Sequence, residues 1–156
     1  MSTIEAAKKD PHMASDELDR NGNAIVVQQG PNGVKGPFAN SDLDRLAEAL
    51  TMSSWETGIN FSAYIGDLGD DRRATISKLH GSFGEQAAET CMVAVSPDQR
   101  AVEVATGSDV AKRLSDRSCN LAILSMTTSF IGGDLIGGIV GGLRMLSDQA
   151  GSSNRR

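Results

Sequence analysis

The stretch TCMVAVSPDQRAVEVAT, residues 90–106, decides the fold class of this 156-residue chain. Five apolar residues at 91–95 follow one another without a polar break, which is typical of a strand that is covered on both faces. The residues at 97–99 favour a turn. Valine then alternates with glutamate in 101–106, as expected for a half-exposed strand. The stretch therefore predicts a β-hairpin.

Upstream of the hairpin, residues 59–65 are expected to form another strand. The loop 66–71 follows this strand, and Asp70 or Asp71 can cap a helix that runs to about His80. A strand, a helix and a strand in this order favour a right-handed parallel crossover. Because the hairpin adds an antiparallel strand, the sequence predicts a small mixed β-sheet flanked by helices, which is an α/β fold.

Further helices are expected on either side of these strands. Residues 40–41 can cap a helix that ends at Gly58, and residues 115–116 can open another helix after the hairpin. Residues 121–143 are apolar enough to be mistaken for a membrane span, but Asp134 lies in their middle, where a charge is costly. A double glycine just before Asp134 breaks this stretch, so we expect two buried helices there.

The domain boundaries follow from composition. Residues 1–23 are polar and show no periodicity, so a disordered tail is expected there. Within it, HMAS at 12–15 resembles the remnant that cloning sites leave, although a native origin is equally plausible. Residues 24–150 are expected to form a single α/β domain that starts with a short peripheral strand, and residues 151–156 a second disordered tail.

The charge balance limits the class of partner. The formal net charge is −5, and residues 37–150 carry nine basic and fifteen acidic side chains. An acidic surface repels the phosphates of nucleic acids and anionic lipids, and it can attract cations or basic partners. Aromatic residues make up only 4% of the chain, which argues against a stacking platform for single-stranded nucleic acid. We therefore expect no nucleic-acid partner.

The two cysteines, Cys91 and Cys119, lie in apolar runs, so we expect buried free thiols rather than a disulfide or a reactive thiol. Neither CxxC nor Cys/His spacing indicates a zinc site. The residues at 1–10 contain no apolar segment typical of a secretory signal. Together these features favour a reducing, cytoplasmic location.

Four aspartates are candidate metal ligands. Asp67, Asp70 and Asp71 follow the strand at 59–65, and Asp98 follows the next parallel strand. The carboxyl ends of parallel strands meet at one edge, where open α/β sheets bind their ligands. A site built from oxygen ligands alone would suit Ca²⁺ or Mg²⁺ as the cofactor. The alternative is that Asp70 or Asp71 caps a helix and that Asp98 makes a turn.

Glycine recurs in steps of four near the last expected helix, at 133, 137 and 141 and again at 138 and 142. Each glycine inside a helix costs about 1 kcal/mol relative to alanine, so another interaction must offset this cost. We expect close approach of this helix to the sheet or to a neighbouring helix. A homodimer interface is the alternative.

Several short strings occur in one order along the chain: ETG at 56–58, the hairpin at 92–107, LSD at 114–116 and FxxGDxxxGI at 130–139. From 36 to 149 this order resembles the TPM-domain family, named for thylakoid-lumen, photosystem-repair and receptor-modulator proteins. It is most similar to a small, soluble actinobacterial branch of unassigned function. The resemblance implies a Rossmann-like α/β/α fold. For some relatives it implies divalent-cation binding and weak acid phosphatase activity, and for others an accessory role in assembling or repairing membrane complexes.

The residues themselves support no catalytic assignment. The chain lacks the Cys-x5-Arg loop of thiolate phosphatases, and His80 has no obvious Ser or Cys partner. Arg72 and Arg73 could hold a phosphate or could be surface charges. Our leading hypothesis is a TPM-like binding or accessory domain that acts through a protein partner. The alternatives are a divalent-metal-dependent phosphomonoesterase and a Ca²⁺- or Mg²⁺-binding module without catalysis.

Overall fold

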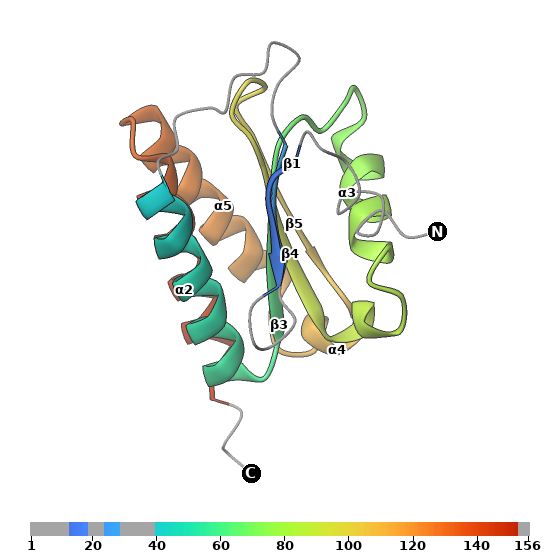
Figure 1. Ribbon diagram of the computed structural model, residues 1–156. Coiled ribbons are helices and arrows are strands. Elements are labelled where there is room, and N and C mark those ends of the chain that lie inside the picture. The colour runs from blue at the N-terminus through green and yellow to red at the C-terminus, as the bar shows by residue number, and fades with distance from the viewer. Residues whose placement is uncertain (1–12, 19–23, 29–39, 153–156) are drawn as a thin grey trace.

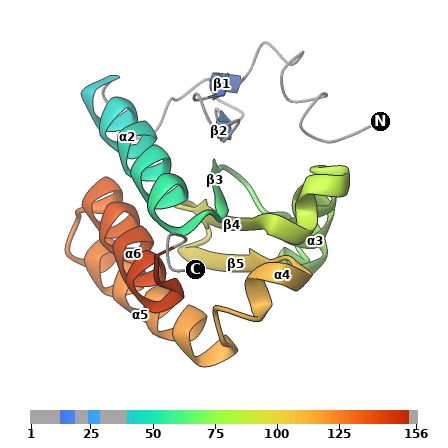
Figure 2. The same cartoon turned by 90° about the horizontal axis from the view of Figure 1, so that it is seen from below.

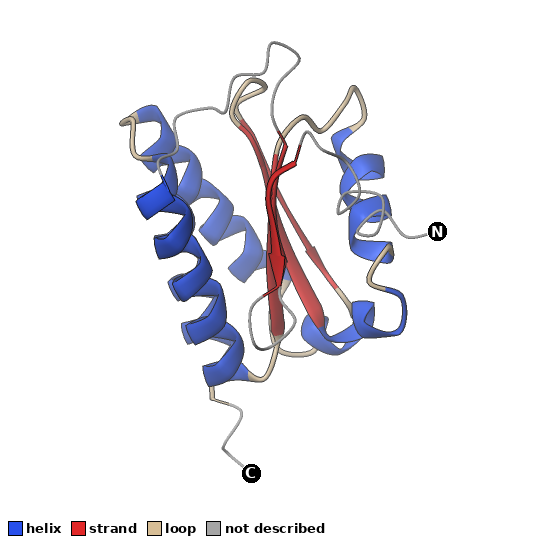
Figure 3. Ribbon diagram, viewed as in Figure 1, coloured by secondary structure: helices blue, strands red, loops and turns tan. Residues whose placement is uncertain are grey.

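The computed structural model of the chain describes residues 13–18, 24–28 and 40–152. Within them, five strands form one sheet in the order β1-β2-β3-β4-β5 (Figures 1 and 3). β2, β3 and β4 run parallel, whereas β1 and β5 are antiparallel to their neighbours. The predicted α/β fold with a small mixed sheet is confirmed. The strands are β1 (Met13–Leu18), β2 (Ala24–Gln28), β3 (Asn60–Ile65), β4 (Thr90–Ser96) and β5 (Ala101–Thr106).

Helices cover both faces of the sheet (Figure 2). On one face lie α2 (Asn40–Thr57), α5 (Asp116–Ile131) and α6 (Leu135–Ala150), with α6 between the other two. On the other face, α3 (Arg72–Gly81) packs on β4 and β5. Two short helices, the 3-10 helix η1 (Gly84–Glu89) and α4 (Ser108–Ala111), pack together at the edge where β4 begins.

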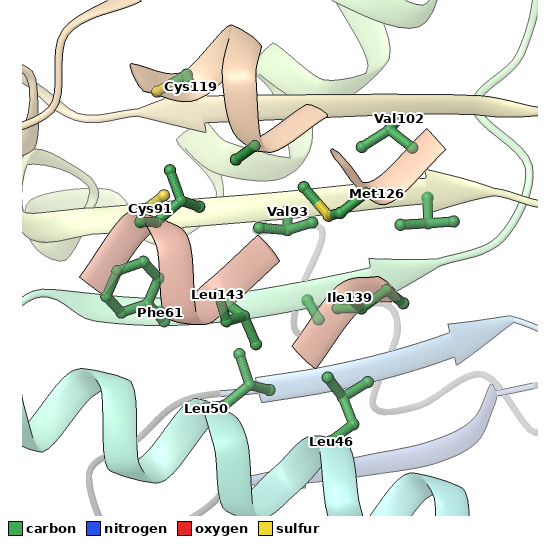
Figure 4. Close-up of a cluster of buried hydrophobic side chains, with 14 of the residues drawn as sticks. Leu46, Leu50, Phe61, Cys91, Val93, Val102, Cys119, Met126, Ile139 and Leu143 are labelled. Carbon is green, nitrogen blue, oxygen red and sulfur yellow. The ribbon is translucent and has the colours of Figure 1, made fainter. Parts of the chain in front are cut away.

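The larger hydrophobic core lies between the sheet and the three-helix layer (Figure 4). Leu50 of α2 points toward Leu143 of α6, and Leu46 of α2 points toward Ile139 of α6, and all of these side chains are fully buried. β4 is buried along its whole length because helices cover it on both faces. This burial is what the continuous apolar run of β4 predicts. A smaller core under α3 contains Tyr64, Leu68, Ile76, Leu79, Met92 and Ala94.

α5 and α6 approach closely because two glycines of α6 face α5. A Cβ atom at Gly138 would lie 2.8 Å from Cβ of Ser129, and a Cβ atom at Gly142 would lie 2.6 Å from Cγ of Met126. A Cβ atom at Gly141 would meet open space instead. The close helix packing predicted from the glycine spacing is therefore confirmed at two of the positions, and the homodimer alternative stays a prediction.

The apolar stretch at 121–143 belongs to two helices, as predicted. α5 ends at Ile131, and Gly133 adopts a φ of 92° in the connection. The Asp134 side chain then accepts a hydrogen bond from the backbone nitrogen of Gly137 (3.0 Å), so that α6 begins with a capped first turn. Among the described residues, no helix combines the length and the apolar character that crossing a membrane requires.

The structure corrects the expected N-terminal tail. Met13–Leu18, inside the segment 1–23 that we expected to be disordered, forms β1 and pairs with β2. Its sequence, MASDEL, lacks an apolar alternation. The strand could not be predicted for this reason, because it forms by pairing with β2, and composition does not reveal such a tertiary contact. The remaining residues of both expected tails lie outside the described residues, except for Gly151 and Ser152.

Candidate functional site

The carboxyl ends of β3 and β4 lie at one edge of the sheet, and the loops that follow them are tied together. Gln99 accepts a hydrogen bond from the backbone nitrogen of Leu68 (2.8 Å) through Oε1, and it donates one to the carbonyl of Gly69 (2.7 Å) through Nε2. The parallel crossover therefore brings the candidate metal ligands to one edge, as expected. These are Asp67, Asp70, Asp71 and Asp98.

All four of these aspartates are exposed, and one has a structural role. Asp71 caps α3, because its Oδ1 atom accepts a hydrogen bond from the backbone nitrogen of Ala74 (3.1 Å). Within the described ranges, no three His, Cys, Asp or Glu side chains form a group that could hold a metal ion. The capping alternative is confirmed for Asp71, and a metal site at this edge stays a prediction.

Other candidate residues are held by structural contacts. Arg72 pairs with Glu103 of β5 across 3.5 Å, and His80 Nε2 lies 3.0 Å from the carbonyl oxygen of Thr90. Cys91 and Cys119 are free and buried, as predicted, and burial raises the pKa of both thiols. Neither thiol is therefore activated for nucleophilic chemistry at neutral pH.

The opposite edge of the sheet, where β3 begins and α2 ends, lies in the lower part of Figure 1. An open pocket of about 940 Å³ lies at this edge. It joins segments that are far apart in the sequence: the end of α2, the start of β3, η1 and the end of α6. We call it the acidic pocket, and the lining residues used below are Trp55, Glu56, Glu89, Ser147 and Asp148.

Local sequence fixes where the two helices end. Gly58 adopts a φ of 78° and donates a backbone hydrogen bond to the carbonyl of Ser54 (2.8 Å), which closes the last turn of α2. Thr57 Oγ1 accepts a hydrogen bond from the backbone nitrogen of Ile59 (3.0 Å), so the chain turns directly into β3. Gly151, with a φ of 82°, ends α6 in a similar way.

Arg113 holds these two helix ends together. Its guanidinium donates hydrogen bonds to the carbonyl of Thr57 at the end of α2 (2.6 Å) and to the carbonyls of Ala150 (3.1 Å) and Gly151 (2.8 Å) at the end of α6. The carbonyls of a last helical turn lack partners within the helix, and they carry the negative end of the helix dipole. A guanidinium therefore stabilises both ends at once.

The pocket nevertheless keeps an excess of negative charge. Glu56, Glu89 and Asp148 are exposed along its lining. Among the described residues, the ion pairs are Arg72–Glu103 and Lys112–Asp109, so these three carboxylates are paired with none of the described basic side chains. The last turns of α2 and α6 contain no basic residue either. The electrostatics of the acidic pocket therefore favour a cation.

Two further groups in the pocket point to a ligand. Trp55 has 76% of its surface exposed, although a large aromatic side chain is normally packed or bound. Ser147 is only 6% exposed, and its Oγ atom has no hydrogen-bond partner among the described residues. A buried hydroxyl without a partner costs free energy, so a ligand atom that bonded to it would remove that cost.

Sequence reasoning did not find this pocket. Its lining residues come from segments around 54–60, 86–89 and 147–152, and no periodic pattern connects them. Two signals were nevertheless present in the sequence: the single tryptophan stands beside Glu56, and neither helix carries a basic residue in its last turn.

The comparison with known proteins agrees with the fold and assigns no activity. Two curated relatives are 34% identical over 122 residues, covering 78% of this chain and 72% of each relative. They are the uncharacterized proteins MT2543 and Rv2468c from the CDC 1551 / Oshkosh and H37Rv strains of Mycobacterium tuberculosis.

Solved structures show the same fold at low sequence identity. The N-terminal domain of a P. gingivalis protein matches with a TM-score of 0.64 and 19% identity, over 73% of this chain and 76% of that domain. The BA42 protein from Bizionia argentinensis matches with a TM-score of 0.65 and 10% identity, over 76% of this chain and 87% of that protein. Residues 21–147 match the family described as "Domain of unknown function (DUF5130)", and the chain belongs to this family.

Proposed function

We propose that this chain is a TPM-like binding or accessory domain, and that it binds a protein partner at the acidic pocket. The observation that carries the proposal is the combination of an exposed tryptophan with three carboxylates that are paired with no described basic side chain, in one pocket of about 940 Å³. Exposed tryptophans are frequent anchors of protein interfaces. Charged groups around such an anchor add specificity and steer the partner toward it.

Two further observations support the accessory-domain proposal. The string ETG at 56–58, on which the resemblance to the TPM-domain family partly rests, forms part of the wall of the acidic pocket. The buried thiols of Cys91 and Cys119 are free, which is consistent with the cytoplasmic location that we propose.

A site-specific cross-linking experiment tests the proposal. We would introduce a photo-reactive phenylalanine at Trp55 in cells that make this protein, with the same residue at Ile131 as the matched control. Ile131 is also highly exposed, at 81%, but it lies at the other end of the helical layer. We expect a defined adduct from position 55, which identifies the partner protein. This partner, purified without the cross-link, should bind the wild-type chain at least tenfold more tightly than it binds the Asp148→Lys variant. Equal adducts from both positions, or none from position 55, would overturn the proposal.

The metal hypothesis has a separate test at the other edge of the sheet. If Asp67, Asp70, Asp71 and Asp98 gather around Ca²⁺ or Mg²⁺, excess ion should raise the melting temperature by several degrees over that in chelator. Asp67→Asn should abolish the rise without loss of the Asp71 cap. Melting curves that coincide in ion and in chelator would leave these residues as a helix cap and turn residues, and would also end the phosphatase alternative that depends on them.

A further inference from the structure

We infer that the acidic pocket binds the guanidinium group of an arginine side chain on the partner protein. The inference rests on the proposed function, and it names the chemical group that the pocket recognises. Three features of the pocket support it: its charge, the aromatic surface of Trp55 and the buried hydroxyl of Ser147.

The charge of the pocket favours a cation. Glu56, Glu89 and Asp148 lie around one pocket and form no ion pair with any described residue. The carboxyl-terminal ends of α2 and α6 lie here as well, but Arg113 already donates to their carbonyls, so the excess negative charge comes from the three carboxylates. A bare metal ion is a poor match, because the described side chains form no group of three ligands that could coordinate one. The expected ligand is therefore an organic cation.

The aromatic surface of Trp55 favours a planar cation. A guanidinium stacks on an indole and is more weakly hydrated than an ammonium ion, so it loses less hydration on binding. The chain itself shows that this edge of the molecule accommodates a guanidinium. Arg113 donates to three carbonyls at the same two helix ends, and its distances of 2.6–3.1 Å are those of ordinary hydrogen bonds.

The hydroxyl of Ser147 supplies a buried hydrogen-bond acceptor. Ser147 lines the pocket from the last turn of α6, and its Oγ atom is buried and lacks a partner among the described residues. A guanidinium has five N–H donors in a fixed plane, so it can bond to this hydroxyl while other donors reach the carboxylates. An ammonium group has three donors on one atom and cannot span such separated acceptors equally well.

The single tryptophan makes the test direct, because all indole fluorescence of the chain comes from the pocket. The probe is the peptide acetyl-Gly-Arg-Gly-amide, titrated at an ionic strength of about 0.15 M, where a Debye length of about 8 Å screens charges at the far edge of the molecule. The controls are the same peptide with lysine and with citrulline, which keeps the shape of arginine but is neutral. We expect saturable change of the Trp55 emission with the arginine peptide, weaker binding of the lysine peptide and no saturation with the citrulline peptide.

Matched variants distinguish the effect of the pocket carboxylates on peptide binding from the effect of the overall charge of the protein. Replacing Glu56, Glu89 and Asp148 by their amides should weaken binding about tenfold or more, because several charge contacts are lost together. Replacing Asp67, Asp70 and Asp98 by asparagine removes the same charge at the opposite edge and should change binding less than about twofold.

A second pair of variants tests the hydroxyl. Ser147→Ala should weaken binding of the arginine peptide about threefold or more, as expected for one lost hydrogen bond. Ser62→Ala is the matched control, since Ser62 is also buried without a hydrogen-bond partner but does not line the pocket. Ser62→Ala should leave binding unchanged.

The outcomes distinguish this inference from the proposed function. Equal binding of the arginine and citrulline peptides, or equal loss from both sets of amide variants, would overturn the recognition of a guanidinium. If the peptides fail to bind but the cross-link from position 55 persists, the pocket binds a partner by other chemistry. If the cross-link fails while the arginine peptide binds specifically, the pocket recognises a guanidinium, but the proposal that it binds a protein partner is wrong.

Discussion

Two buried serines carry hydroxyl groups that have no hydrogen-bond partner among the described residues. They are Ser62 in β3 and Ser147 in α6. Because a buried, unsatisfied hydroxyl is costly, we expect Ser62→Ala and Ser147→Ala each to raise the free energy of unfolding by about 1 kcal/mol. Denaturant unfolding measures this change. A loss of stability in Ser147→Ala would show that the hydroxyl has a structural partner and would weaken its assignment as a ligand contact.

Tyr64 makes stability depend on pH in the alkaline range. Burial and, to a lesser extent, the Asp67 carboxylate raise its pKa to about 12, and its hydroxyl donates a hydrogen bond to the carbonyl of Asp67 (2.9 Å). The pKa of Tyr64 in the folded protein lies above the unfolded value of 10.0. The stability that its neutral phenol contributes is therefore fully present below pH 10 and is lost as the pH rises toward 12.

The expected loss from Tyr64 over this window is about 2–3 kcal/mol, and Tyr64→Phe should not show it. Tyr64 is the single tyrosine of the chain, so phenolate absorbance reports its titration directly. We expect a midpoint near 12 in the folded protein and near 10 in denaturant. Coincident midpoints would contradict burial of the phenol.

At the scale of the helix, neighbouring glycines of α6 should respond to substitution in opposite directions. Gly141 faces open space, so Gly141→Ala should stabilise the protein by up to about 1 kcal/mol through helix propensity. Gly142→Ala would place its Cβ atom against Met126 and should destabilise it by about 1–3 kcal/mol. Thermal and denaturant unfolding of the two variants measure the contrast. Equal effects would mean that α5 and α6 are not packed closely at Met126.

The elements that sequence could predict are those with a local signal. The β4–β5 hairpin follows from a continuous apolar run and an alternating one, and the break between α5 and α6 follows from a double glycine before Asp134. η1 and α4 are too short to show a period. β1 is polar, and its pairing with β2 is a tertiary contact without a local signal.

The candidate site was less predictable than the fold for a physical reason. Sequence placed Asp67 and Asp98 at one edge correctly, because a parallel crossover fixes which strand ends meet. It left open whether Asp70 or Asp71 caps α3 or binds a metal, since capping and ligand roles use the same carboxylate oxygens, and the structure shows the cap at Asp71. It also missed the acidic pocket, because Trp55 and Ser147 come to line one pocket only when α2 packs against α6.

At the scale of the whole molecule, Arg113 connects segments that are distant in sequence. Its partner at the end of α2 lies 56 residues before it, and its partners at the end of α6 lie 37 and 38 residues after it. Its three hydrogen bonds hold the ends of α2 and α6 in place, and these ends form the acidic pocket. Because the guanidinium is partly exposed, Arg113→Ala should lower the free energy of unfolding by only about 1–2 kcal/mol. Arg113→Lys should recover less than half of this loss, since one ammonium group cannot span three carbonyls.

The same variant should affect the pocket more than the rest of the fold. In Arg113→Ala we expect faster hydrogen exchange in the last turns of α2 and α6, and unchanged exchange in β4, which the helices bury on both faces. Trp55 emission should report the change as well, because the indole lies at the end of α2 beside the loosened contact. Uniformly faster exchange across the sheet would instead show that Arg113 stabilises the whole domain and does not specifically hold the pocket.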